Sequence, residues 1–218
     1  MKKFLLFCLI SLICICSYLF YFIFYKQHLS KDFELFIETN QPYEDVVLVL
    51  SQVLFNNHTT QYLDTFIFKF ISNQKRLHYW IRPGRYIMSS SASLNDMINK
   101  LRSRVQEPVL FTFNSMDNLQ DIFSIAGNTL EIDSIDIENY IQSKNIIIDS
   151  LYFKFIPNTY ELFWNISAEN FINRINKEYN IFWNQERIHA ANSCNLSKNE
   201  VFVLASIVDK EASHFDEM

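Results

Sequence analysis

The residues with the clearest capacity for chemistry lie near the C-terminal end of the chain, in the segment SKNEVFVLASIVDKEA, Ser197–Ala212. Ser197 and Glu200 form an S-x-x-E capping box, a pattern that predicts the start of a helix. Apolar residues then recur at helical spacing, at Val201, Leu204, Ala205, Val208 and Ala212. The segment therefore predicts one amphipathic helix.

That helix carries an acid in an unusual place. At about 100° per residue, Glu211 projects between Leu204 and Ile207 on an apolar side, while Asp209 and Lys210 point toward a more polar flank. A carboxyl group held against apolar neighbours keeps its proton more easily, and a protonated carboxyl is what acid-catalysed cleavage of a glycosidic bond needs. Taken alone, the pattern favours the plainer interpretation that Glu211 reaches water near a frayed helix end.

Other chemistries find less support in the sequence. Glu211 and His214 have the E-x-x-H spacing of di-iron bundles, but that use also needs two further glutamates on facing helices, and we give it little weight. With only two glycines in 218 residues, a Gly-rich phosphate-binding loop is excluded. The net charge of −5 gives no basis for nucleic-acid binding. We expect no metal, no cofactor and no nucleic-acid partner.

The opposite end of the chain predicts the location of the protein. Lys2 and Lys3 precede an apolar run from Phe4 to Tyr25, which would span about 33 Å as a helix and so match a bilayer core. The run is too long and bulky for a cleaved signal peptide and lacks a small-x-small cleavage site. We expect residues 1–3 to be a cytoplasmic tail, residues 4–25 to be a single transmembrane helix, and the rest to be extracytoplasmic.

After the anchor, residues 26–107 predict a small α+β unit, and residues 108–218 predict a second one. In the first unit we expect a strand at Asp32–Ile37, helices at Tyr43–Phe55 and Tyr62–Ile71, a strand at Arg85–Met88 and a helix capped by Ser93. In the second we expect a strand at Val109–Phe113, helices at Leu119–Ala126 and Ile135–Gln142, and a helix capped by Ser167. Gly127 is expected to end its helix, and Pro157-Asn158 to break any regular element.

Two blocks carry a specific resemblance. FIPNTYELFWNISAENF, from Phe155 to Phe171, followed by LASIVDKEA, from Leu204 to Ala212, resembles the endolytic murein transglycosylases, also called MltG or YceG-like proteins. The resemblance runs nearly from end to end and includes the anchor and the PGRY turn. It implies that the first unit is a LysM-like module and the second part of a YceG-like catalytic domain. It also maps the catalytic acid onto Glu211, with Asp209 a conservative departure.

The resemblance implies a lyase that cuts the peptidoglycan strand between N-acetylmuramic acid and N-acetylglucosamine without water. Glu211 would protonate the leaving oxygen, and the sugar's own 6-hydroxyl would close a 1,6-anhydro end. Glycan strands and the cell inner membrane are the expected partners, with peptidoglycan synthases as candidate protein partners. Of the aromatic residues, Tyr160, Phe163, Trp164 and Trp183 could stack on sugars, although core packing is the commoner use.

Two departures from the family pattern keep an alternative open. The chain stops at Met218, soon after the acid, so we expect a catalytic domain that is C-terminally truncated or a fragment. FNSMDN, Phe113 to Asn118, stands where relatives place glycines. The alternative is therefore a membrane-anchored peptidoglycan-binding protein, or a truncated gene product, without catalysis.

Overall fold

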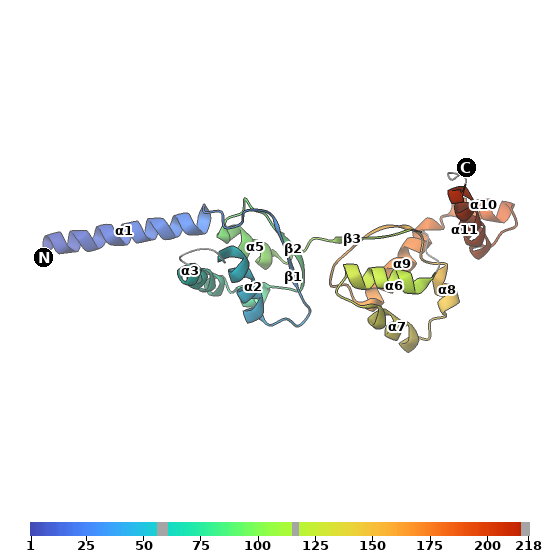
Figure 1. Cartoon of the computed structure of the whole chain (residues 1–218), viewed down its shortest axis with the longest axis horizontal. Helices are drawn as coiled ribbons and strands as arrows, with labels where there is room; N and C mark the ends of the chain where they lie inside the picture. Colours follow the sequence, from blue (N-terminus) through green and yellow to red (C-terminus); the bar gives the residue numbers. More distant parts are fainter. Residues whose placement is uncertain (56–60, 115–117, 215–218) are drawn as a thin grey trace. The chain divides into compact units, whose positions relative to one another are not determined.

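Figure 1 shows the computed structural model of the chain, which describes residues 1–55, 61–114 and 118–214. Helices and small antiparallel sheets make up the described residues, so the predicted α+β class is confirmed. The chain forms two compact units, Met1–Glu107 and Pro108–Met218, each with its own apolar core.

Unit 1 begins with the long apolar helix α1 (Lys2–Phe24), which is long and apolar enough to cross a membrane. Most of its side chains are exposed, but Phe22 is completely buried in the core of unit 1. The Phe22 ring stacks on Phe55 at 6.2 Å and meets the His28 ring edge-on at 4.6 Å. His28 Nε2 also lies 3.2 Å from the carbonyl oxygen of Phe22. The last turns of α1 are therefore part of the folded unit, without an intervening linker.

The rest of unit 1 packs helices against a two-stranded antiparallel sheet. Strand β1 pairs with β2 so that Leu35 lies opposite Tyr86, and both side chains are buried. The elements of unit 1 after α1 are β1 (Phe33–Ile37), α2 (Tyr43–Phe55), α3 (Gln61–Gln74), α4 (Leu77–Trp80), β2 (Gly84–Met88) and α5 (Leu94–Ser103). The predicted strands and long helices of this unit are confirmed, whereas the short α4 was not expected.

Helix α5 shows how local sequence fixes an element. Ser93 is its N-cap, as predicted, and its Oγ accepts a hydrogen bond from the Asp96 backbone N–H at 3.3 Å. In return the Asp96 carboxylate accepts the Ser93 backbone N–H at 3.2 Å, which completes a capping box. The hydroxyl of Ser93 also donates to this carboxylate and lowers the pKa of Asp96.

Unit 2 has the same mixture of elements. In chain order they are β3 (Val109–Phe113), α6 (Leu119–Thr129), α7 (Ser134–Ser143), α8 (Ile148–Tyr152), β4 (Asn158–Leu162), α9 (Ala168–Phe182), α10 (Gln185–Ser193) and α11 (Lys198–His214). Strands β3 and β4 pair antiparallel with Phe111 opposite Tyr160. Phe171 of α9 meets Phe111 edge-on at 5.4 Å, so α9 and the sheet share one aromatic core.

Two sequence-based expectations about unit 2 need correction. Pro157 interrupts the regular structure as expected, but Asn158 does not, because it is the first residue of β4, a strand that was not expected. Helix α6 does not end at Gly127 but continues to Thr129. This continuation allows the Leu130 N–H to bond to the Ala126 carbonyl at 2.8 Å and places the Leu130 side chain in the core. The short helices α8 and α10 were not expected.

Candidate active site

Helix α11 carries the predicted catalytic acid, and its start is as the sequence predicts. The Glu200 backbone N–H donates to Ser197 Oγ at 3.3 Å, and the Ser197 backbone N–H donates to the Glu200 carboxylate at 2.7 Å. The hydrogen bond from the Ser197 side chain is the main cause that lowers the pKa of Glu200. The capping box therefore fixes the first turn of α11 and, with it, the direction in which each later side chain points around the helix axis.

One aromatic side chain holds α11 against the rest of unit 2. The Phe202 ring lies edge-on to the rings of Tyr152 and Phe153, with centroids 5.6 and 5.5 Å away. One turn before it, the Lys198 ammonium lies 5.6 Å from the centre of the Trp183 ring and 5.7 Å from that of Tyr179. Tyr152 is the last residue of α8 and Phe153 follows it, while Tyr179 and Trp183 lie at the end of α9. The position of α11 therefore depends on the folding of the rest of unit 2.

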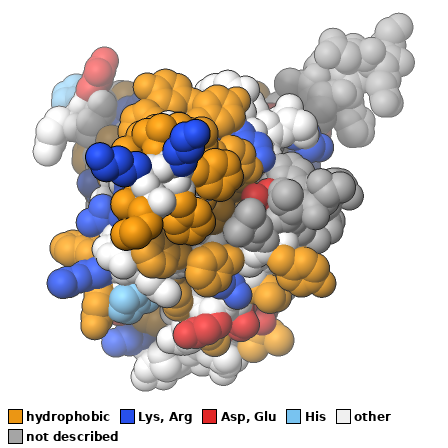
Figure 2. All heavy atoms as spheres, turned by 90° about the vertical axis from the view of Figure 1, so that its left-hand side faces the viewer, with side chains coloured by type: hydrophobic (Ala, Val, Ile, Leu, Met, Phe, Trp, Pro, Cys, Tyr) orange, Lys and Arg blue, Asp and Glu red, His pale blue; other side chains and the backbone are white. Residues whose placement is uncertain are grey.

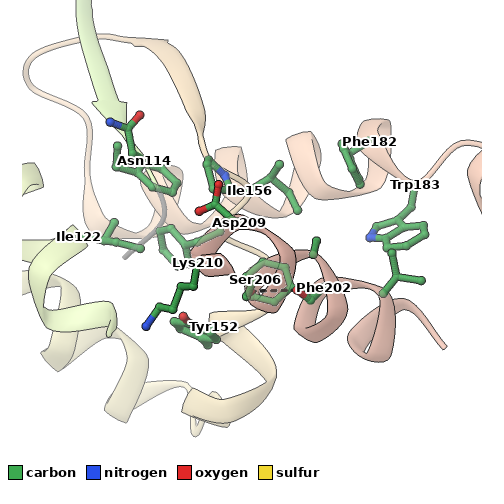
Figure 3. A pocket seen from close by; sticks show the side chains of 15 residues that line it. Asn114, Ile122, Tyr152, Ile156, Phe182, Trp183, Phe202, Ser206, Asp209 and Lys210 are labelled. Carbon is green, nitrogen blue, oxygen red and sulfur yellow. Dashed lines mark hydrogen bonds between the residues drawn. The ribbon is translucent and has the colours of Figure 1, made fainter. Parts of the chain in front are cut away.

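A pocket of about 520 Å³ lies beside α11, a volume typical of small-molecule sites. Its walls come from the end of β3, from α6 and α8, from the segment before β4, from the end of α9 and from α11 (Figure 3). The lining residues outside α11 are Phe113, Asn114, Ile122, Tyr152, Phe155, Ile156, Pro157, Phe182 and Trp183. Nearly all of them are apolar or aromatic, so the wall of the pocket outside α11 is mainly apolar.

Most of the polar groups come from α11. Ser206, Asp209 and Lys210 line the pocket together with Val201, Phe202 and Ala205 of the same helix (Figure 3). The Ser206 hydroxyl donates to the Phe202 carbonyl at 2.9 Å, which leaves the charged pair of Asp209 and Lys210 as the ionic groups of this wall. Asp209 is thus the carboxylate that the structure places at the pocket. The sequence pattern assigns it to a polar flank instead.

Glu211 occupies a different side of α11. Its side chain is exposed, and it shares its stripe with Val203, Leu204 and Ile207, which are 47, 50 and 54% exposed. The exposure of Glu211 agrees with the plainer interpretation that it reaches water, while Asp209 and Lys210, expected on a polar flank, line the pocket. The physical reason is that Phe202 makes the packing contacts, and the longer aliphatic stripe remains at the surface.

The remaining candidate residues have mixed outcomes. Tyr160 belongs to the core: it is 3% exposed, its hydroxyl donates to the Ile156 carbonyl, and burial raises the pKa of Tyr160 to about 12. Trp183 is buried and lines the pocket, whereas Phe163 is 53% exposed. The backbone carbonyl of Trp164 accepts a hydrogen bond from the Glu131 N–H at 2.8 Å. Trp183 is thus the member of this group at the candidate site.

The side chain of His214 lies outside the described residues, so the structure adds nothing on the E-x-x-H pair. Within residues 1–55, 61–114 and 118–214, no three His, Cys, Asp or Glu side chains gather closely enough to hold a metal ion.

Comparison with known proteins assigns the family. Residues 36–218 match the model of the YceG-like family, and the chain belongs to that family. A solved structure of a YceG-like protein from Listeria monocytogenes is similar at 14% identity and a TM-score of 0.36. The match covers 77% of this chain and 60% of that one, so the chain spans about three-fifths of that relative. A search of curated proteins gave no significant match. Family membership supports a cell-wall-associated function.

Proposed function

We propose that the protein is a membrane-anchored lytic transglycosylase that cleaves peptidoglycan glycan strands between N-acetylmuramic acid and N-acetylglucosamine. The observation that carries the proposal is the family match over residues 36–218, which includes the acid-bearing helix α11. The pocket beside α11 adds support at the level of a ligand site, because a largely apolar hollow with a few polar groups is the usual form of such a site.

In the proposed reaction Glu211 acts first as an acid and then as a base. Its carboxyl group gives a proton to the glycosidic oxygen, so that the bond from this oxygen to C1 of the muramic residue breaks and positive charge develops at C1. The 6-hydroxyl of the same sugar attacks C1 and returns its proton to the Glu211 carboxylate. One new C–O bond replaces the one that breaks, water is not consumed, and the enzyme regains its starting state.

Asp209 is the competing candidate for the proton transfer. Both carboxylates are exposed, but Asp209 lines the pocket, whereas Glu211 lies on a different side of the helix. The resemblance to the family favours Glu211, and the geometry of the pocket favours Asp209. Because the two residues are on the same helix, replacing one at a time in an otherwise identical chain shows which of them is needed for cleavage.

The location and partners belong to the same proposal. Helix α1 would anchor the chain in the cell inner membrane with Lys2 and Lys3 on the cytoplasmic side, since basic residues favour that side. Both folded units would then face the peptidoglycan. Peptidoglycan synthases are the proposed protein partners, because they make the strands that this enzyme would cut.

The test uses the full chain in detergent with purified sacculi, and mass spectrometry to count the 1,6-anhydro ends released. We expect Glu211→Gln to abolish these ends, a loss of at least about 100-fold for a general acid. Glu161→Gln, which changes an exposed carboxylate on β4, is the matched control and should leave the rate unchanged.

Three other results would contradict parts of the proposal. Full activity in Glu211→Gln together with its loss in Asp209→Asn would transfer the catalytic role to Asp209. Products with ordinary reducing ends would show hydrolysis instead of the lyase reaction. Binding to sacculi without any cleavage by the unaltered chain would favour the alternative of a glycan-binding protein.

A further inference from the structure

Helix α3 carries an exposed row of aromatic rings that the proposed reaction does not use. Tyr62, Phe66 and Phe70 recur every four residues, so they share one side of the helix, and they are 94, 67 and 56% exposed. The other side of α3 packs into unit 1, where Phe68 is 1% exposed. Large rings in a contiguous exposed row are unusual on a surface that meets water alone.

The aromatic row continues an apolar surface of α1. An entirely apolar hollow of about 690 Å³ lies between the two helices. It is lined by Phe66, Ile67, Phe70 and Ile71 of α3 and by Cys14, Ile15, Tyr18, Leu19 and Ile23 of α1. Figure 2 looks toward the N-terminal end of α1 and shows hydrophobic side chains gathered over this face of the molecule, with basic side chains among them.

The position of the hollow along α1 gives its depth in a bilayer. Because Phe22 is buried in the core of unit 1, the part of α1 left for the membrane would end at Tyr21 and not at the expected Tyr25; from Phe4 to Tyr21 it is roughly 27 Å long at about 1.5 Å per residue, close to the thickness of a hydrocarbon core. With Tyr21 at the outer edge, Tyr18 and Cys14 lie about 5 and 10 Å below it. A hollow that has these residues as one wall lies at the same depth, and so do the α3 residues that form the other wall.

We propose that α3 lies in the outer leaflet of the membrane, with the row Tyr62, Phe66 and Phe70 immersed among lipid acyl chains that also fill the hollow beside α1. The proposal rests on the anchor assigned to α1 above. An interfacial amphipathic helix buries its apolar side by about 5–10 Å, which agrees with the depth worked out from α1. Lys69 lies exposed to one side of the row and can extend its ammonium group to the headgroups.

The burial of Phe22 makes this arrangement rigid. Because the last turns of α1 belong to the core of unit 1, α3 is held at a fixed height along α1 and is not carried on a linker. Unit 1 would therefore be partly sunk in the membrane. In a bilayer, the aromatic row and the hollow would be covered by lipid without any change in the fold.

The test is site-specific photocrosslinking in the full chain reconstituted into phosphatidylethanolamine–phosphatidylglycerol vesicles. The photoreactive aromatic residue p-benzoylphenylalanine replaces Phe66 or Phe70, and mass spectrometry measures lipid adducts after illumination. Phe20 of α1, which is 55% exposed, is the positive control. Phe36 of β1, an aromatic residue of unit 1 that is 42% exposed, is the matched negative control, since β1 lies at the end of the unit away from the free end of α1 (Figure 1).

We expect lipid adducts at Phe66 and Phe70 to approach those at Phe20 and to exceed those at Phe36 by about tenfold. Adducts at Phe20 but not at Phe66 or Phe70 would overturn the inference and leave the anchor in place. So would crosslinks from Phe66 or Phe70 to a second copy or to another protein, or equal labelling of Phe36. Absence of lipid adducts at Phe20 would refute the anchor itself, and the inference with it.

Discussion

The attachment of α11 to unit 2 depends on Phe202, and the variant Phe202→Ala tests this directly. Phe202 is the α11 side chain that contacts the Tyr152 and Phe153 rings. Its removal should release α11 while the sheet and α9 keep their fold, because the core of unit 2 contains no residue of α11. The helix that carries both candidate acids would then open locally.

The size of the effect follows from the burial of Phe202. A fully buried Phe→Ala change costs about 3–5 kcal/mol. Phe202 is half-buried, and its two edge-to-face contacts contribute about 0.5–1.5 kcal/mol each, so we expect a loss of about 2 kcal/mol in the local stability of α11. That loss corresponds to a roughly 30-fold faster amide exchange in α11 if exchange follows the opening equilibrium.

Hydrogen exchange followed by mass spectrometry measures this, with peptides from α11 compared with peptides from β3 and α9. Leu204→Ala is the matched control on the same helix. Leu204 is 50% exposed, and Ala has a similar helix propensity, so its effect should stay within about 0.5 kcal/mol. If Leu204→Ala loosens α11 as much as Phe202→Ala does, then the packed side of the helix is the opposite one and our account of the pocket is wrong.

Two further predictions concern the cores of the two units. Burial raises the pKa of Tyr160 to about 12 from an unfolded value of about 10, so the stability that the neutral phenol contributes is complete below pH 10 and is lost as the pH rises toward 12. Circular dichroism between pH 9 and 12 should show this loss in the unaltered chain and a smaller one in Tyr160→Phe; equal losses would contradict it. Ser93→Ala should lower the stability of unit 1 by about 1 kcal/mol at pH 7, because it removes the cap of α5. The penalty should shrink as the pH falls through the lowered pKa of Asp96, where the carboxylate side of the capping box is lost in both proteins; denaturant unfolding at pH 7 and pH 2 measures it, and a constant penalty would argue against this role of Asp96.

Elements with a local start signal and a strong period could be predicted from the sequence. Ser93 and Ser167 each begin a helix whose apolar residues follow at helical spacing, and the structure has both caps. Strand β4 is the opposite case. The alternation of Tyr160 and Leu162 is a strand signal, but it is short and follows Pro157, and only pairing with β3 makes it a strand.

The orientation of α11 could not be predicted, because apolar residues lie on more than one of its sides. Periodicity alone selects as the packed side the one with Val201, Leu204, Ala205, Val208 and Ala212, yet Leu204 and Val208 are 50 and 59% exposed. The structure instead packs Phe202, since its partners Tyr152 and Phe153 lie some 50 residues earlier in the chain and come together with it only in the folded unit. The spacing of apolar residues within one helix carries no information about which distant segment will pack against it.

The orientation of α11 also bears on which residue, Asp209 or Glu211, is the catalytic acid. A general acid works best where water is scarce, because exclusion of water favours its protonated form and strengthens its interaction with the reacting oxygen. Both carboxylates are exposed, but Asp209 lines the pocket, whereas Glu211 lies on another side of the helix with Leu204 and Ile207. For Glu211 to act as the acid, something must cover that apolar stripe during the reaction, and a glycan strand laid along it would do so. The proposal for Glu211 therefore requires that Leu204→Ala, although harmless to the fold, weakens turnover of glycan; if turnover is unchanged, the pocket acid Asp209 becomes the better candidate.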